Sequence, residues 1–536
     1  MLKDGKILVG KSGDKELFIL PQMANRHGLI TGATGSGKTI TLKVMAESFS
    51  EMGVPVFLSD IKGDLAGTCL PGETSEKLES RLKGIGITDF KYKGFPVVFW
   101  DVFGKDGHPV RAKIEDIDPV ILSRMLGLSE VQEGVLALAM RIARDKNMPV
   151  IDLKDLRTLL NYVGEKRQEY TISYGNMSAQ SIGSIQRSVI QLEDQGGNKF
   201  FGEPELDIND FLKIDNATGN GNINILHAVE LFKQPNLYAT FMLWLLSTLN
   251  NTLPEVGDLD KPKVVFFFDE AHLLFNELPG YMLTKITQIV KLIRSKGIGL
   301  FFISQTPNDI PNEILAQLSN KVQHTLRAYT PADQKIVKAV ADSFRTNPEF
   351  DTAEAILGLG TGEALISFAT EKGDPNIVEK ATILPPQSNM GSIEMPMRLM
   401  MMSRSPFYGK YDDAVDSESA YEQITEEVTA KAEEEKAAKE EAERIKREEA
   451  EKKQAEKEAK EKEKAELAAQ KQKEKEEKEA EKAKKEKERE EAKKKKEEEK
   501  AKANNPVNKL GKKVANKAAN KVIDKGLNKL FKNLFK

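Results

Sequence analysis

The chain has 536 residues and a net charge of only −3, so neither a strongly basic nor a strongly acidic character marks the chain as a whole. Its length exceeds what one ordinary hydrophobic core organises, which predicts more than one domain. Cys69 is the only cysteine, which excludes an intrachain disulfide and favours a reducing compartment.

The sequence shows neither a signal-peptide pattern nor a stretch typical of a membrane-spanning helix. The first 20 residues have no signal-peptide pattern, and the longest strongly apolar stretch, 238–249, is too short to span a bilayer and predicts a buried helix. We therefore expect a cytoplasmic protein, with a peripheral position at a membrane or the nucleoid left open.

The first part of the chain predicts an α/β fold. Residues 1–25 predict short strands, too few for a separate barrel. Residues 26–114 alternate between apolar strands and a helix, at 27–31, 37–53, 54–60 and 95–103. Continuous apolar strands between helices predict a mainly parallel sheet that is covered on both faces.

The middle of the chain changes pattern twice. Residues 115–221 have helical spacing and predict an α-helical insertion. Within 222–384 the sheet resumes, with strands expected at 222–228, 263–269, 298–305, 322–328 and 362–368. Residues 385–421 are rich in Pro, Met and Ser and predict a linker.

A phosphate-binding loop stands between the first strand and the first helix of this sheet. "GATGSGKT" matches G-x-x-x-x-G-K-[ST] in full, with these residues as candidate nucleotide contacts: Gly32, Ala33, Thr34, Gly35, Ser36, Gly37, Lys38 and Thr39. Backbone N–H groups and the helix N-terminus attract phosphate. Lys38 is expected to reach the β- and γ-phosphates of ATP, and Thr39 to offer its hydroxyl to Mg²⁺.

A second half-site follows a later strand. In "KVVFFFDE", Asp269 is a candidate Mg²⁺ ligand and Glu270 a candidate for polarising the attacking water. An adjacent Asp-Glu pair favours ATP hydrolysis over nucleotide binding alone. Gln305, at the end of the next strand, is a candidate γ-phosphate sensor or an ordinary strand-end amide. No N/T-K-x-D motif for reading guanine is present, which argues against a GTPase.

Four segments together resemble a known family: "RHGLITGATGSGKT", "VFLSDIKGDLAG", "VVFFFDEAHLLF" and the run from "LIRSKGIGLFFISQTPNDIP" through "HTLRAYTPADQ". They are similar to the bacterial HerA-like (YjgR-type) helicases of the HerA–FtsK superfamily, over roughly residues 1–400. The resemblance implies a RecA-like P-loop NTPase core with a helical insertion, assembled as a hexameric ring that moves duplex DNA through its channel.

Further site residues follow only from this resemblance. Asp60 matches an acidic residue near the nucleotide, and Arg26 matches an arginine that reaches the ATP of a neighbouring subunit. Arg327 resembles a second arginine, of the same subunit, and Arg294 is a weaker candidate for the γ-phosphate region. Each of these arginines is otherwise an ordinary salt-bridge residue at the surface.

We expect the chain to differ from archaeal HerA proteins, because residues 1–25 leave no room for their N-terminal barrel and a charged tail is added. The core shows no zinc knuckle, helix-turn-helix or basic stripe. Lys62 and Lys199 are loop candidates for DNA contact in a ring, or simply solvated lysines.

The C-terminal tail has two parts. Residues 431–500 hold 52 Asp, Glu, Lys or Arg in 70 positions, so 422–503 predicts a charged single helix or a disordered tail without a coiled-coil seam. Residues 504–536 hold nine Lys against one Asp and predict a basic amphipathic helix. Such a helix suits a membrane surface, a protein partner or DNA.

Two functions remain from the sequence. The first is an ATP-hydrolysing DNA translocase or helicase, hexameric, with ATP and Mg²⁺ as its cofactors. The alternative is an ATPase that drives protein secretion, remodelling or assembly at a membrane, without dependence on DNA.

Overall fold

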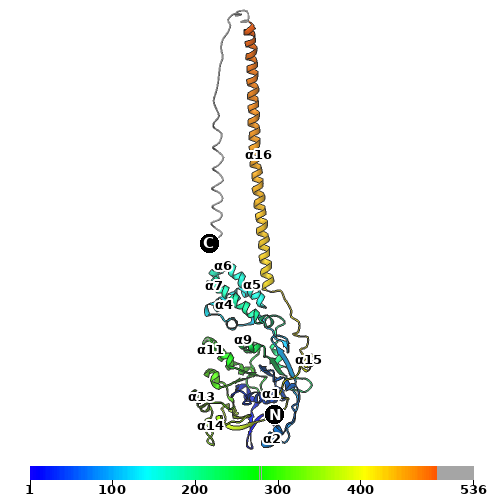
Figure 1. Ribbon diagram of the computed structural model, residues 1–536, viewed down its shortest axis with the longest axis vertical. Helices are drawn as coiled ribbons and strands as arrows, with labels where there is room; N and C mark the ends of the chain where they lie inside the picture. Colours follow the sequence, from blue (N-terminus) through cyan, green and yellow to red (C-terminus); the bar gives the residue numbers. More distant parts are fainter. Residues whose placement is uncertain (277, 279, 492–536) are drawn as a thin grey trace, which may run out of the picture. The chain divides into compact units, whose positions relative to one another are not determined.

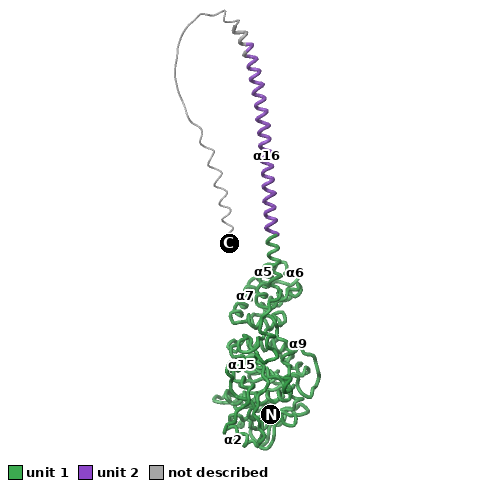
Figure 2. Tube along the Cα trace, turned by 90° about the vertical axis from the view of Figure 1, so that its right-hand side faces the viewer, with its two compact units in different colours: residues 1–433 green, residues 434–536 purple. Residues whose placement is uncertain are grey.

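The computed structural model describes residues 1–276, 278 and 280–491 and divides the chain into two compact units, 1–433 and 434–536 (Figure 2). The first unit contains the sheet and the helices that pack on it. The second unit contains the greater part of one long helix.

A central set of parallel strands organises the first unit. The strands lie in the order β11-β4-β10-β9-β5-β8-β6-β7, and their neighbours in this set all run parallel. Their bounds are β4 Gly28–Thr31, β5 Val56–Asp60, β6 Val97–Asp101, β7 His108–Pro109, β8 Ile223–His227, β9 Val264–Phe268, β10 Ile298–Ser304 and β11 Asn320–Gln323. The mainly parallel α/β sheet expected from the sequence is confirmed.

Antiparallel strands extend the sheet beyond β11. Their order is β11-β12-β13-β2, with β1 and β3 both pairing with β2. The bounds are β1 Leu2–Lys3, β2 Lys6–Ser12, β3 Lys15–Ile19, β12 Glu363–Ser367 and β13 Glu379–Ile383. The N-terminal strands thus continue the same sheet. β13 was not expected from the sequence, because Glu379 and Lys380 interrupt its apolar pattern.

The two faces of the sheet bury alternate residues of the same strands. Ile30 and Phe267 pack on the face covered by α1 (Lys38–Glu51), together with Leu42 of that helix. Leu29 and Phe268 pack on the opposite face, in one core with α9 (Pro235–Thr252) and α11 (Gly280–Leu292). Burying each such side chain contributes about 1.5–3 kcal/mol, so both faces must be covered. α9 contains the apolar stretch 238–249 and is buried, as expected.

The segment between β7 and β8 is helical. It contains α3 Pro119–Met125, α4 Glu130–Asp145, α5 Leu153–Glu165, α6 Arg167–Tyr174, α7 Ala179–Asp194 and α8 Gly197–Phe200. Figure 1 shows α4 to α7 gathered away from α1, α13 and α14. The run 119–146, which lies within the predicted helical insertion, forms two helices, because Gly127 has a φ of +61° and Ser129 is the N-cap of α4, in a capping box.

The remaining helices of the first unit are short. Their bounds are α2 Glu76–Gly84, α10 His272–Phe275, α12 Asn312–Leu315, α13 Pro331–Asp342, α14 Thr352–Leu357 and α15 Met395–Ser403.

Residues 385–421, expected to be a linker, are packed against the sheet. The ring centroids of Phe407 and Tyr411 lie 5.3 and 5.6 Å from that of Trp100 in β6, and both side chains are buried. Arg398 of α15 lies over the ring of Phe99, 4.5 Å from its centroid. The Pro-, Met- and Ser-rich composition suggested no core, but these three side chains pack against β6.

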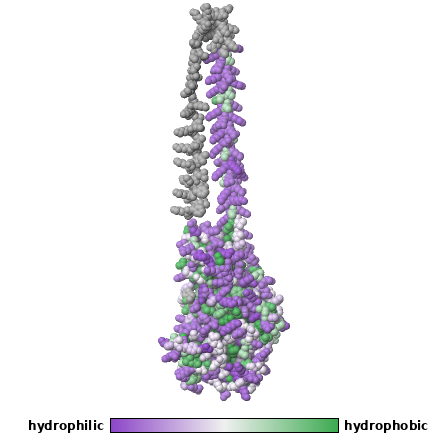
Figure 3. All heavy atoms as spheres, viewed as in Figure 1, coloured by the Kyte–Doolittle hydropathy of each residue, from purple (hydrophilic) through white to green (hydrophobic). Residues whose placement is uncertain are grey.

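The charged tail begins as a helix. α16 spans Ala420–Glu491, and of the two alternatives left open by the sequence the described part of the tail is helical. Its first turns belong to the first unit, where Glu427 accepts from Lys166 and from the hydroxyl of Tyr162. Figure 3 shows mostly hydrophilic residues along α16.

The predicted basic helix at 504–536 lies outside the described residues. Among the residues that the structure describes, no helix is both long enough and apolar enough to cross a membrane.

We predict that Tyr411→Phe lowers the free energy of unfolding by about 1–3 kcal/mol, because a buried hydrogen-bonding group is lost. The Tyr411 hydroxyl donates to Asp210 and accepts from the backbone N–H of Asp207 at 3.1 Å. Burial, with the bond to Asp210, raises the pKa of Tyr411 to about 12. Urea unfolding of the full chain measures the effect, with the exposed Tyr408→Phe as control. Equal stabilities of the two variants would contradict this packing.

Candidate nucleotide site

The phosphate-binding loop, 32–39, joins the carboxyl end of β4 to α1, which begins at Lys38. Gly32, Gly35 and Gly37 have φ of +150°, +79° and +118°, a region that L-residues other than glycine rarely adopt. The loop therefore has the backbone that its glycines predict, at the N-terminus of a 14-residue helix. We call the side of the sheet where β4 and its parallel neighbours end the carboxyl edge.

Two backbone hydrogen bonds attach the loop to neighbouring strand ends. Gly32 N–H donates to the carbonyl of Gln305 at 3.1 Å, and Ala33 N–H donates to that of Thr325 at 2.8 Å. These bonds fix the entry of the loop between the ends of β10 and β11.

His324 lies next to Gly32 of the phosphate-binding loop. Its Nδ1 lies 2.9 Å from the carbonyl oxygen of Glu363, and its Nε2 lies 2.9 Å from Thr41 Oγ1. Burial lowers the pKa of His324 to about 4, so the ring is neutral at pH 7. Because a carbonyl only accepts, Nδ1 carries the proton and Nε2 accepts from the hydroxyl of Thr41.

The side chains of the loop include a lysine and three hydroxyls. Lys38 Nζ donates to the carbonyls of Gly32 at 2.6 Å and Ala33 at 3.2 Å. Burial lowers the pKa of Lys38, against the opposing influence of Asp269 and Glu270. Ser36 is buried, and its hydroxyl has no hydrogen-bond partner in the described chain. These are polar groups that an anion would satisfy.

Asp269 lies beside the loop because β10 separates β9 from β4 by a single strand. Its N–H donates to Ser59 Oγ at 3.1 Å, and its carbonyl oxygen lies 2.7 Å from the hydroxyl of Tyr238. Its carboxylate accepts from Glu270 N–H at 2.9 Å. Burial, reinforced by the charge of Glu270, raises the pKa of Asp269 to about 6. A nearby cation would stabilise the ionised form.

Glu270 has a strained backbone and a shielded carboxylate oxygen. Its φ is +47°, rare for a residue with a side chain. Oε2 is buried and lies 3.3 Å from His272 Nδ1, and neither atom has a hydrogen-bond partner among the residues that the structure describes. Ala271 N–H donates to the carbonyl of Ile303 at 2.8 Å, which holds this turn against β10. Strain of this kind concentrates at functional sites.

Gln305 and Arg327 also lie at the carboxyl edge. Gln305 directly follows β10, with an exposed side chain, and its carbonyl accepts from Gly32. The strand expected over 322–328 ends at Gln323, so Arg327 lies in the following loop and is exposed. Arg327 is two residues beyond Thr325, which bonds to Ala33.

Asp60 shapes the loop that follows β5. Its carboxylate accepts from the N–H groups of Gly63, Asp64 and Leu65, and burial raises the pKa of Asp60. The exposed Lys62 lies in this loop, and its charge contributes to lowering the pKa of Lys38. Asp60 thus brings a second lysine near the phosphate-binding loop.

Arg26 and Arg294 lie at the opposite, amino edge of the sheet. Arg26 ends the turn before β4, and Arg294 precedes β10, with its guanidinium 3.5 Å from Asp258. β4 separates Arg26 from the loop by four residues, about 13 Å at 3.3 Å per residue. Arg294 is therefore not brought to the γ-phosphate region of its own chain, and Arg26 does not reach its own loop.

Four residues that support the site were not expected from the sequence: Ser59, Tyr238, His272 and His324. His272 had a local signal, since it stands two residues after Glu270. The other three come from segments whose approach to the loop only the fold determines.

Comparison with known proteins places these motifs in a family. The family model described as "Helicase HerA-like C-terminal" matches residues 6–533. The chain belongs to this family. The HerA-like resemblance is thereby confirmed, while its bacterial subtype stays a prediction.

Curated relatives are archaeal helicases. The DNA double-strand break repair helicase HerA of Sulfolobus acidocaldarius is 23% identical over 386 residues, 68% of this chain and 66% of the relative. Its counterpart in Sulfurisphaera tokodaii is 25% identical over 388 residues, 68% and 67% respectively. The chain thus spans about two thirds of the length of these relatives.

Some solved structures have a limited similarity to this chain. One is the bacterial conjugative coupling protein TrwBdeltaN70, with 13% sequence identity and a TM-score of 0.48; the alignment covers 73% of this chain and 93% of that chain. Another is VirB4 of Thermoanaerobacter pseudethanolicus, at 14% identity and 0.45, covering 74% and 99%.

We predict that Gly32→Ala lowers the free energy of unfolding by about 3 kcal/mol or more, since a rigid clash is added to backbone strain. A Cβ there would lie 2.5 Å from His324 Cβ and 2.8 Å from Ser36 Oγ. Gly35→Ala is the matched control, because it has positive φ but open space around its Cβ, and about 1 kcal/mol is expected. Urea unfolding compares the two, and an equal loss in both would contradict the close approach of His324.

Proposed function

We propose that this protein hydrolyses ATP with Mg²⁺ at the carboxyl edge of β4, β10 and β9. The observation that carries the proposal is the adjacency of two elements that are 230 residues apart in sequence: the phosphate-binding loop with Lys38, and the Asp269–Glu270 turn. Their proximity is reflected in the influence of both carboxylates on the pKa of Lys38.

The donor set fits a hydrated Mg²⁺ ion. Thr39 and Asp269 are a hydroxyl and a carboxylate, the hard oxygen ligands that Mg²⁺ takes beside phosphate and water. When bound, the ion neutralises charge on the phosphates. Lys38 adds a further positive charge on the side of the loop, and Ser36 offers its unsatisfied hydroxyl.

Glu270 is the proposed general base. It follows the proposed metal-binding Asp269 directly, and its shielded oxygen Oε2 faces His272. This leaves Oε1 to accept the proton of the attacking water. Gln305, at the end of the intervening strand, is proposed to contact the γ-phosphate or that water.

Hydrolysis is proposed to drive a hexameric ring along duplex DNA. Membership in the HerA-like family and the relatives named as DNA double-strand break repair helicases support a DNA substrate. The place of Arg26 at the amino edge supports an arginine that acts on a neighbour's ATP, since its own loop is out of reach. Arg327 and Asp60 remain proposed contacts within the same subunit.

We predict that Glu270→Gln retains ATP binding and lowers kcat by about 10²-fold or more, because an amide cannot take the proton of the water. Steady-state phosphate release and the Kd for ATP measure the two effects separately. The exposed Glu354→Gln in α14 is the control and leaves both unchanged. A Glu270→Gln variant with undiminished turnover would remove Glu270 from this role.

We predict that Arg26→Ala and Lys38→Ala are each inactive alone but regain ATPase activity when mixed. Random assortment in a ring places an intact Lys38 beside an intact Arg26 at about one quarter of the interfaces. The assay is phosphate release after subunit exchange, with unmixed variants at the same total concentration as controls. An active Arg26→Ala variant, or mixed rings without recovery, would exclude the arginine acting between subunits.

A further inference from the structure

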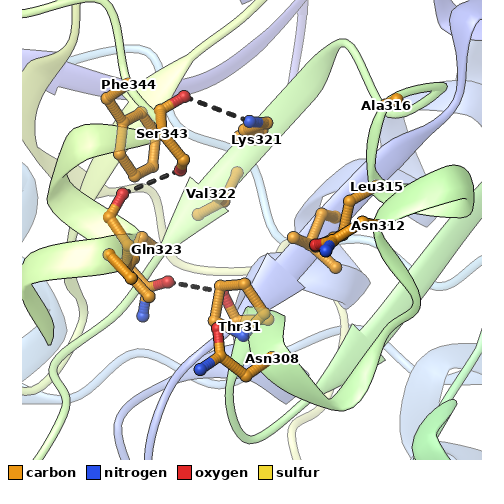
Figure 4. A pocket seen from close by; sticks show the side chains of 14 residues that line it. Thr31, Asn308, Asn312, Leu315, Ala316, Lys321, Val322, Gln323, Ser343 and Phe344 are labelled. Atoms are coloured by element: carbon orange, nitrogen blue, oxygen red, sulfur yellow. Dashed lines mark hydrogen bonds between the residues drawn. The ribbon is translucent and has the colours of Figure 1, made fainter. Parts of the chain in front are cut away.

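A cavity of about 360 Å³ lies between the sheet and the helices α12 and α13 (Figure 4). Its lining includes Leu29 and Thr31 of β4 and their register partners Lys321 and Gln323 of β11. Leu29 belongs to the core opposite α1, so the cavity lies on the sheet face away from the helix that follows the phosphate-binding loop. Volumes of this size accommodate small organic ligands.

Lys321 gives the cavity an uncompensated positive charge. Its Nζ donates to the carbonyl of Ser343 at 3.2 Å and lies 5.8 Å from the centre of the Phe344 ring. The lining contains no Asp or Glu, and within the described ranges no carboxylate comes into ion-pair distance of Lys321. Burial is the sole influence that lowers the pKa of Lys321. A cation that is partly removed from water in this way favours an anionic partner.

The rest of the lining is suited to an apolar body with few polar contacts. Phe344, Leu315 and Val340 contribute apolar surface, whereas Asn308 and Asn312 contribute side-chain amides. Figure 4 shows Lys321 and Phe344 together at one end of the cavity, with the two asparagines nearer Thr31. An apolar wall with one charge and a few amides is the usual composition of a small-molecule site.

The same cavity touches the strand pair that holds the phosphate-binding loop. Thr31 Oγ1 donates to Gln323 Oε1 at 2.6 Å, and His324 N–H donates to the carbonyl of Thr31 at 2.7 Å. The next residue after Thr31 is Gly32, and Ala33 is bonded to Thr325. An occupant that displaces Gln323 or Thr31 therefore acts directly on the entry of the loop.

We propose that this cavity binds a small organic anion, with one carboxylate or phosphate group against Lys321 and a ring-sized apolar body against Phe344 and Leu315. Binding there alters ATP hydrolysis through the Thr31–Gln323 pair. This effect on hydrolysis, unlike the binding itself, rests on the proposed ATPase function.

Binding is tested on the full chain with three probes of similar size: benzoate, phenyl phosphate and the neutral benzyl alcohol. Ligand-observed saturation-transfer NMR gives a Kd for each. At least one of the two anions is expected to bind at least about tenfold more tightly than benzyl alcohol, as a charge-assisted contact requires. Which anion binds more tightly distinguishes a carboxylate ligand from a phosphate ligand. Equal affinity for all three probes, or no binding of either anion, overturns the proposal.

Variants locate the site. Lys321→Gln is expected to weaken the preferred anion at least about tenfold, whereas Lys338→Gln, an exposed lysine of α13, leaves it within about twofold. Val340→Phe fills the cavity while keeping Lys321, and is expected to abolish binding. Thermal melting checks the fold of each variant, and Val340→Phe decides the matter if Lys321→Gln does not fold. Undiminished binding by either folded variant overturns the proposal.

The rate of ATP hydrolysis tests whether anion binding in the cavity affects the nucleotide site. Saturating anion is expected to change kcat by about twofold or more in the wild type and to leave kcat unchanged in Lys321→Gln. If the anion binds but kcat does not change, the coupling to the loop is wrong and the binding site stands. If the wild type hydrolyses no ATP at all, the proposed function is wrong, and the binding experiments remain an independent test of the site.

Discussion

The rest of the structure depends on the parallel arrangement of β4, β10 and β9 as immediate neighbours. Because parallel strands end on the same side of a sheet, this order places the phosphate-binding loop, Gln305 and the Asp269–Glu270 turn together. The hydrogen bond from Gly32 N–H to the carbonyl of Gln305 attaches the phosphate-binding loop to the end of β10. The hydrogen bond from Ala271 N–H to the carbonyl of Ile303 attaches the Asp269–Glu270 turn to the same strand. The proximity of these three groups therefore depends on the order of the strands and not on any single residue.

Burial around this edge determines what the charged groups can do. Burial and the like charge of Glu270 raise the pKa of Asp269, and burial lowers the pKa of Lys38 although Asp269 and Glu270 oppose that shift. Such groups are stabilised by a ligand that brings phosphate to the lysine and a cation to the carboxylate. The backbone of Glu270 is strained, and its Oε2, which faces His272, has no hydrogen-bond partner among the described residues; strain of this kind concentrates at functional sites.

The sequence predicted the phosphate-binding loop and the Asp-Glu turn better than the residues that hold them in place. The loop and the Asp-Glu turn have local signatures, and the apolar strands that carry them were placed within a few residues. Tyr238 and His324 had none, since their value lies in a contact across the fold. The packed segment 385–421 and the strand β13 were missed for the same reason: Tyr411 and the charged Glu379–Ile383 find partners far away in sequence. The amino-edge place of Arg294 likewise required the strand order.

We propose that ATP hydrolysis at this edge drives movement along duplex DNA. The most direct test is the steady-state ATPase rate of the full chain with no DNA, single-stranded DNA and duplex DNA, at low and moderate salt, together with its mass in solution. We expect a hexamer whose ATP hydrolysis is strongly stimulated by duplex DNA. A hexamer whose rate is indifferent to every DNA would contradict it and direct attention to a protein or membrane substrate.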